Sequence, residues 1–220
     1  MNYLFPVIII LLSSCFSCQK KNTVDKQTLD KTLITIGYSN LFLSDTKLLD
    51  SIWQQGNHQF ELEQIISNDS CKLESKFLAS EILDYYNVKL SQENNEVVAQ
   101  AYVFALEHTN VEKNNTLGIN ANQWGFLYEL NDSGHLGKKV ISFGKIALPF
   151  LVKLLDDDGT VFYEGSKEAT IGNAYHYRIK DFAAFYISKI TNNPIQFYKN
   201  YKDRDREIER LKKRIVTNNN

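Results

Sequence analysis

Apolar residues recur at helical spacing through most of the chain, and this periodicity leaves little room for a sheet. Residues three and four apart share one face of an α-helix. In the stretch 71–86, Leu73, Phe77 and Ile82 fall on such a face, and the broader apolar set of 93–109 indicates a central, well-buried helix. Only three prolines and ten glycines interrupt the 220 residues. We therefore expect an all-α domain.

The same spacing predicts further helices and two long connections. Ser44 or Asp45 can cap a helix that ends at Gly56. The other helices are expected over 58–67, 140–155, from about 173 to 190 and 204–215, with Pro149 marking a kink or a helix start. The segments 110–138 and 160–177 have no sustained period, so we expect loops there. Residues 32–43 alone look strand-like, as a short edge strand or an arm on the helices.

Composition and charge exclude several classes of protein. With 43% hydrophobic and 12% aromatic residues, the chain is not disordered, and it is long enough for one sizeable core. A formal net charge of −1 provides no field to attract nucleic acid, so we expect no nucleic-acid partner. Only Cys71 lies in the body of the chain, so there is no disulfide framework.

The first residues have the pattern of an export signal that ends in a lipid attachment site. The run 3–12 is almost wholly apolar, and it is shorter than the roughly 20 residues that a membrane-spanning helix needs. Residues 12–15, Leu-Ser-Ser-Cys, resemble the lipobox of bacterial lipoproteins, in which a branched apolar residue and two small residues precede a cysteine. The resemblance implies that Cys15 receives a diacylglycerol thioether and becomes the first residue after cleavage.

Cys18 is the alternative lipidation site, but it would place Phe16 and Cys15 where the lipobox prefers small and branched residues. No lysine or arginine precedes the apolar run, which departs from the usual signal or points to another start codon. A plain secretory leader and a C-x-x-C metal or redox pair are the other interpretations. Such pairs lie in folded loops or at helix starts, whereas these cysteines lie between an apolar run and a polar segment.

These features divide the chain into four parts. We expect a signal peptide over 1–14, the lipidated cysteine with a flexible tether over 15–31, a single domain over 32–216 and a disordered tail over 217–220. The residues after the cysteine include Lys20 and Lys21, unlike the acidic surface-export signal of some lipoproteins. We therefore expect the protein in the cell envelope of a Gram-negative bacterium, lipid-anchored in the outer membrane and facing the periplasm.

Two pairs of predicted helices resemble two copies of one repeated unit. In the second unit, an apolar helix within 144–159 ends in acidic residues and is followed by 177–190; in the first, 60–70 is followed by 73–86. The second helices resemble that of a HEAT repeat, through Arg178, Ala183, Ala184, Ile187 and Ile190, and through Lys76, Ala79, Ser80 and Leu83. The resemblance covers about half of the chain and implies a HEAT-like domain of helical pairs, a superhelix or bundle, in which small residues let paired helices approach closely.

The chain also resembles uncharacterised bacterial proteins that share four short motifs. These are an N-x-W-G loop, an A-L-P-x-L helix with an acidic end, a Y-E-G-S-x-E-A-T loop and an R-x-K-D-F-A helix. Here they occupy Asn122–Gly125, Ala147–Asp157, Tyr163–Thr170 and Arg178–Ala183. The likeness implies no known activity.

Residues that often carry chemistry show no arrangement for it. The acids at 156–158 are consecutive, whereas a calcium loop alternates its ligands, so we expect a helix end and a turn. The histidines lack metal-binding spacing; they are His58, His108, His135 and His176. Cys71 could gain thiolate character at a helix start, but a buried apolar role is the commoner one. We therefore expect no metal, no cofactor and no catalytic residue.

The two loops carry aromatic and charged residues near helix ends, which is the composition of many recognition surfaces. The candidate binding patch consists of Trp124, Tyr128, Tyr163, Glu164, Glu168, Tyr175, His176 and Arg178. If the helices pair as expected, both loops can lie at one end of the stack. The alternative is that Trp124 fills the core and Arg178 pairs with an acid such as Glu168 or Asp181.

These observations favour a membrane-anchored lipoprotein that binds another protein without catalysis. One version, by analogy alone, is an immunity protein that neutralises a toxin in the periplasm. The rival is a cell-envelope enzyme that uses the loop 163–178. That rival requires Glu164, Glu168, His176 and Arg178 to meet in one concave pocket. The oligomeric state and the identity of the partner stay open.

Overall fold

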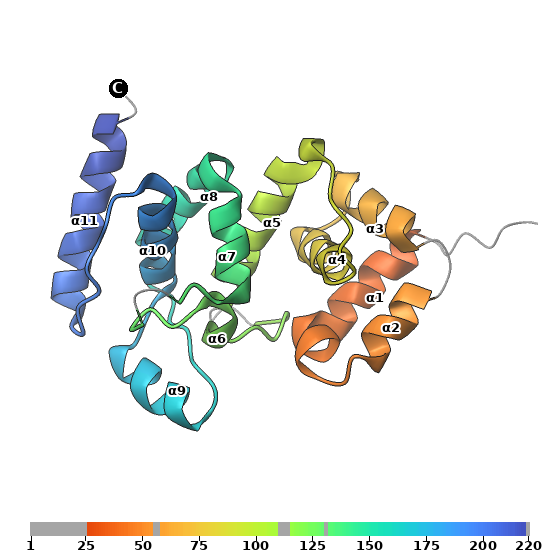
Figure 1. Ribbon diagram of the computed structural model, residues 1–220, viewed down its shortest axis with the longest axis horizontal. Helices are drawn as coiled ribbons and strands as arrows, with labels where there is room; N and C mark the ends of the chain where they lie inside the picture. The colour runs from red at the N-terminus through yellow and green to blue at the C-terminus, as the bar shows by residue number, and fades with distance from the viewer. Residues whose placement is uncertain (1–25, 55–57, 110–114, 130–131, 219–220) are drawn as a thin grey trace, which may run out of the picture.

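A computed structural model describes residues 26–54, 58–109, 115–129 and 132–218, and these ranges contain no β-strand (Figure 1). The prediction of an all-α bundle of helical pairs is confirmed. The α-helices are α1 Lys26–Tyr38, α2 Lys47–Gln54, α3 His58–Ser67, α4 Leu73–Tyr85, α5 Asn95–Glu107, α6 Ala121–Trp124, α7 Gly134–Ser142, α8 Leu148–Lys153, α9 Ser166–Gly172, α10 Ile179–Thr191 and α11 Tyr201–Asn218. Shorter turns are η1 Ser39–Leu43, which is π-helical, and the 3₁₀ turns η2 Gln92–Asn94, η4 Gly144–Ile146, η5 Leu154–Asp156 and η6 Asn173–Tyr175.

The helices are arranged along one long axis. Helices α1, α2 and α3 lie at one end, α11 lies at the other, and α4, α5, α7 and α10 fill the middle (Figure 1). Both expected helix pairs form, because α3 packs on α4 and α8 with η5 packs on α10. The small residues of the second helices are buried: Ala79 and Ser80 in α4, Ala183 and Ala184 in α10. These short side chains let the paired helices approach closely.

The segment expected as a strand or arm is helical, and α1 includes residues from Lys26 onward that were expected in the tether. Leu29 and Leu33 are buried, and Ile36 packs partly against the same core, at helical spacing that continues N-terminally into the expected tether. Burial of this face overrides the strand preference of the β-branched residues. Gly37, at φ 74°, then turns the chain so that the Tyr38 N–H donates to the Leu117 carbonyl at 2.8 Å.

The boundaries of the later helices also differ from the predicted ones. The expected helix over 140–155 is broken at Gly144, which has φ 56°, and restarts at α8 with Pro149 in its first turn. The expected loops contain α6, α9 and the start of α7. Helix α10 begins at Ile179, because His176 takes a left-handed φ of 49° that ends the preceding turn. Helix α11 continues to Asn218, beyond the expected end of the domain at 216.

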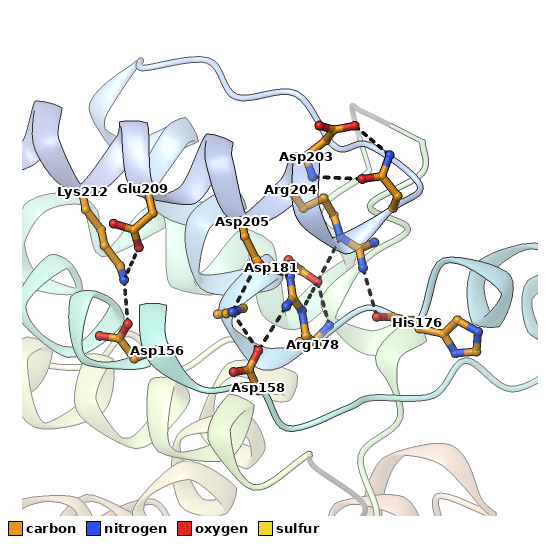
Figure 2. A network of polar contacts seen from close by, with 12 residues as sticks. Asp156, Asp158, His176, Arg178, Asp181, Asp203, Arg204, Asp205, Glu209 and Lys212 are labelled. Carbon is orange, nitrogen blue, oxygen red and sulfur yellow. Dashed lines mark hydrogen bonds and ion pairs between the residues drawn. The ribbon is translucent and has the colours of Figure 1, made fainter.

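A buried carboxylate joins α10 to α11 (Figure 2). Asp181 has no exposed surface, and it accepts hydrogen bonds from the Arg178 N–H at 2.9 Å and from the Arg178 Nη2 at 3.1 Å. Arg204 of α11 approaches the same carboxylate, with its Nε 3.5 Å from Oδ2. In return, Asp205 of α11 lies 2.8 Å from the Arg178 guanidinium. Each buried charge therefore has an opposite charge beside it, as burial requires.

The acidic run forms the helix end and turn that the sequence predicts, and its charges hold α11. Asp157 caps the turn by accepting from the Gly159 N–H at 2.8 Å. Asp158 pairs with Lys180 at 2.7 Å, and Asp156 pairs with Lys212 at 2.6 Å (Figure 2). The Lys180 ammonium lowers the pKa of the Asp158 carboxyl, because the hydrogen bond favours the charged form.

Replacing Asp181 with asparagine should strongly destabilise the domain. Asp181→Asn keeps the shape of the side chain but leaves Arg204 buried without its anion, which costs about 3–5 kcal/mol of unfolding free energy. Glu209→Gln is the control, because Glu209 is 59% exposed and its pair with Lys212 should contribute below about 1 kcal/mol. Urea denaturation followed by circular dichroism measures both. Equal losses in the two variants would contradict a special role for the buried carboxylate.

Candidate functional site

The two loops of the sequence analysis pack against each other and form one surface. We call residues 115–129 and 160–178 together the paired-loop face. Asn122 clasps the backbone of Glu164: its Nδ2 donates to the Glu164 carbonyl and its Oδ1 accepts from the Glu164 N–H, both at 2.9 Å. The Asn120 side chain donates to the Glu164 carboxylate at 2.9 Å, and the Ala121 N–H donates to the Phe162 carbonyl at 2.9 Å. These bonds fix one loop upon the other.

Tyr163 holds the same two loops together from beneath. Its hydroxyl donates to the Gly125 carbonyl at 2.8 Å and accepts from the Leu127 N–H at 3.3 Å. Its side chain is 2% exposed, and burial raises the pKa of the phenol, so Tyr163 stays neutral. The ring packs so closely on Gly172 that a Cβ there would lie 2.3 Å from it. Tyr163 is therefore a structural residue of the face.

Trp124 fills the core below the paired-loop face. It has no exposed surface, and its Nε1 donates to the Thr109 hydroxyl at 2.7 Å. Its carbonyl accepts from the Tyr186 hydroxyl of α10 at 2.5 Å. Helix α7 passes close enough that a Cβ on Gly137 would lie 2.7 Å from both the Trp124 carbonyl oxygen and the Tyr186 hydroxyl. The N-x-W-G motif thus builds the junction of α6, α7 and α10.

Three residues of the predicted binding patch are not available to a partner. Trp124, Tyr163 and Arg178 are buried, so the patch was wrong at these positions. The alternative interpretation is correct for two of them, because Trp124 fills the core and Arg178 pairs with Asp181. The other predicted residues reach the surface in part or in full; they are Tyr128, Glu164, Glu168, Tyr175 and His176.

Apolar side chains that the sequence analysis did not select complete the surface of the paired-loop face. Phe162 is 47% exposed and Ile171 of α9 is 38% exposed. Half-buried tyrosines lie in the same loops, with the Tyr128 and Tyr175 rings stacked at 6.2 Å between centroids. Phe162 lies between buried Val161 and Tyr163. Because side chains alternate between two faces along an extended segment, its exposure could have been predicted from the sequence.

The four residues of the enzyme hypothesis do not converge. Arg178 turns toward Asp181 and α11, whereas the His176 imidazole points away from it (Figure 2). Glu164 is engaged by Asn120. Across the described ranges, His, Cys, Asp and Glu side chains do not gather in threes as a metal site would require. The paired-loop face is therefore better suited to contact a surface than to enclose a substrate.

A separate cavity of about 490 Å³ lies between α4, α5 and α7. Its lining includes the ion pair of Asp84 with Lys139, and Tyr102. The Tyr102 hydroxyl donates to Glu81, a carboxylate that is only 3% exposed and that also lies 3.1 Å from the His135 Nε2. This cluster was not predicted, although Glu81, a glutamate amid the apolar residues of a predicted helix, was a signal for it.

We found no family model, curated protein or solved structure that matches this chain, so a function has to be argued from its own residues.

The contact of His135 with Glu81 should make stability depend on pH. The hydrogen bond to Glu81 raises the pKa of His135 above its ordinary value, against the opposing effect of burial. The stabilisation is then complete below the unfolded-state pKa of about 6.5 and is lost as the pH rises through the higher folded-state pKa. Urea denaturation should therefore show a larger difference between wild type and His135→Gln at about pH 5.5 than at about pH 8.5.

The same measurement in the Glu81→Gln variant is the control, because it compares the effect of His135→Gln with and without the carboxylate. Without the carboxylate, the pH-dependent part of the His135→Gln effect should disappear, because the imidazolium has no buried anion to pair with. A difference between wild type and His135→Gln that stays constant across the pH range would rule out the charged pair.

Proposed function

We propose that this protein is a cell-envelope lipoprotein, held to the membrane by lipid on Cys15, whose helical domain binds another protein without catalysis. The lipobox pattern at 12–15 supports the anchor; it lies outside the described residues. Within the described residues, no helix combines the length and the apolar character needed to cross a bilayer. The proposed attachment is therefore the lipid, for which two or three acyl chains give durable anchoring.

The main support for a binding role is that the paired-loop face is partly apolar and is held rigid by hydrogen bonds between its two loops. Asn122 and Tyr163 fix its two loops, so a partner would meet a surface that is already ordered and that loses little entropy on binding. Phe162 and Ile171 offer exposed apolar area, and aromatic anchors of this kind dominate protein interfaces. Loops held on a rigid scaffold are a common place for recognition.

Acidic residues in and beside the paired-loop face favour a basic partner surface. Burial raises the pKa of Tyr128, and so do the nearby carboxylates of Glu129, Glu168 and Asp132. These acids lie around a half-buried aromatic ring, and opposite charge on a partner would complement them. A toxin with a basic surface, neutralised in the periplasm, is one partner that this mode would serve.

A photo-crosslinking amino acid at Phe162 should capture the partner in the cell envelope. We expect a discrete crosslinked product in membranes from cells that carry Phe162→p-benzoylphenylalanine. Val152 of α8 is the control position, because it is 38% exposed but lies outside the paired-loop face. In addition, Phe162→Ser should reduce co-purification of the captured protein, whereas Val152→Ser should not. Capture from both positions alike, or from Val152 alone, would contradict binding through this face.

Substitution of the two leader cysteines tests the anchor separately. Cys15→Ala should accumulate as unprocessed precursor, because the lipid transfer that precedes cleavage has lost its thiol. Cys18→Ala should mature normally. The length of the chain and incorporation of labelled palmitate report the two steps, and normal maturation of Cys15→Ala would remove the assignment.

A further inference from the structure

Aromatic side chains form a connected group at the end of the molecule where the described chain begins. The Trp53 ring of α2 stacks on Tyr86 with centroids 4.0 Å apart and planes 11° apart. The ring centroids of Tyr86 and Tyr85 are 5.1 Å apart, and those of Tyr85 and Phe42 are 6.4 Å apart. Together with Leu43, which follows Phe42, these residues make up what we call the N-terminal aromatic patch.

Much of this end of the molecule is apolar and open to solvent. Tyr85 is 49% exposed and Leu43 is 42% exposed. Leu48 of α2 and Phe60 in the first turn of α3 are 40% and 51% exposed, and both helices lie at the same end of the long axis (Figure 1). Tyr85 and Leu43 are the exposed members of the patch, and its other residues are half-buried against the core: Phe42, Trp53 and Tyr86. Connected apolar groups are a commoner place for contacts than scattered apolar residues.

The path of the chain indicates what the N-terminal aromatic patch meets. Helix α1 starts at the end of the molecule where α2 and α3 also lie (Figure 1). Residues 16–25 separate Cys15 from Lys26. At most about 3.5 Å per residue, this segment keeps a lipid on Cys15 within about 40 Å of the start of α1. A bilayer that holds Cys15 is therefore within reach of the patch.

We propose that the N-terminal aromatic patch rests in the headgroup region of the membrane that holds the lipid on Cys15. The proposal rests on the lipid anchor of the proposed function. Tryptophan and tyrosine suit this region, because their rings are apolar and their polar groups can remain hydrated. The Tyr86 hydroxyl is already satisfied, since it donates to Asp50 at 2.7 Å.

Such a contact would orient the domain as well as strengthen its attachment. Helices α1, α2 and α3 would face the bilayer, while α11 at the opposite end of the long axis would point away from it (Figure 1). The paired-loop face would then be held beyond the first helices, open to a partner in the periplasm. A second copy of the chain is the other candidate to cover the patch, and the experiment separates the two.

Fluorescence of the full, lipidated chain in phosphatidylcholine vesicles tests the contact. The sequence has two tryptophans: Trp53 in the patch, and Trp124, which has no exposed surface and serves as an internal reference. Lipid brominated near the headgroup should quench part of the wild-type emission relative to plain vesicles. Trp53→Phe should abolish that loss, and Leu43→Ser with Tyr85→Ser should reduce it while Trp53 remains.

The possible results discriminate between the two proposals. Equal emission in brominated and plain vesicles, from protein whose mass shows lipid on Cys15, would overturn the membrane contact and leave the lipoprotein standing. Protein that carries no lipid and does not associate with vesicles would overturn both. A change in Trp53 emission with protein concentration in detergent, together with equal emission in the two kinds of vesicle, would assign the patch to a second copy.

Discussion

The close packing around Trp124 is the contact on which the rest of the molecule depends. Its indole lies where α6, α7 and α10 meet, with Tyr186 bonded to its carbonyl and Gly137 against it. The following Gly125, at φ 109°, lies so near Ser133 that a Cβ would meet its carbonyl carbon at 2.5 Å. Gly125 and Gly137 leave no room for a side chain at this junction, so the packing holds the loop that carries Asn122 in one conformation. The second loop can then bind to it in a defined place.

The charged side chains near α10 pair with one another within the fold, and these ion pairs leave them unavailable to bind a ligand. Arg178 and Asp181 neutralise one another within one turn of helix, and α11 contributes the remaining partners. A buried ion pair of this kind adds little net stability, but removing one member leaves the other stranded. Arg178, which belonged both to the predicted binding patch and to the enzyme hypothesis, is therefore occupied inside the protein. The surface that remains for a partner is carried by aromatic and apolar side chains.

Local periodicity predicted the helices whose buried residues recur at regular helical spacing. It did not predict the conformation of segments that is set by contacts with residues distant in sequence. The bounds of α3 match the predicted 58–67, because Leu62, Ile65 and Ile66 are buried at helical spacing. The strand-like segment at 32–43 is helical because its inner face packs on the core, which no local preference records. For the candidate site, the sequence indicated the two loops and that both could lie at one end of the stack. The inward turn of Tyr163 depends on Gly125, 38 residues earlier in the chain, and on Gly172 in the next helix, so it could not be predicted from the adjacent residues.

The position of α11 has a consequence for the order in which the protein can be assembled. Asp181 and Arg178 are synthesised before Arg204 and Asp205, because they lie earlier in the chain. Until the last helix arrives, α10 can bury its carboxylate beside only one arginine, and the acidic turn lacks Lys212. The contacts of α10 and of the acidic turn with α11 can therefore form only after α11 has been synthesised. A product truncated before α11 would keep this side open, which gives a protease a means to distinguish it from the protein that carries α11.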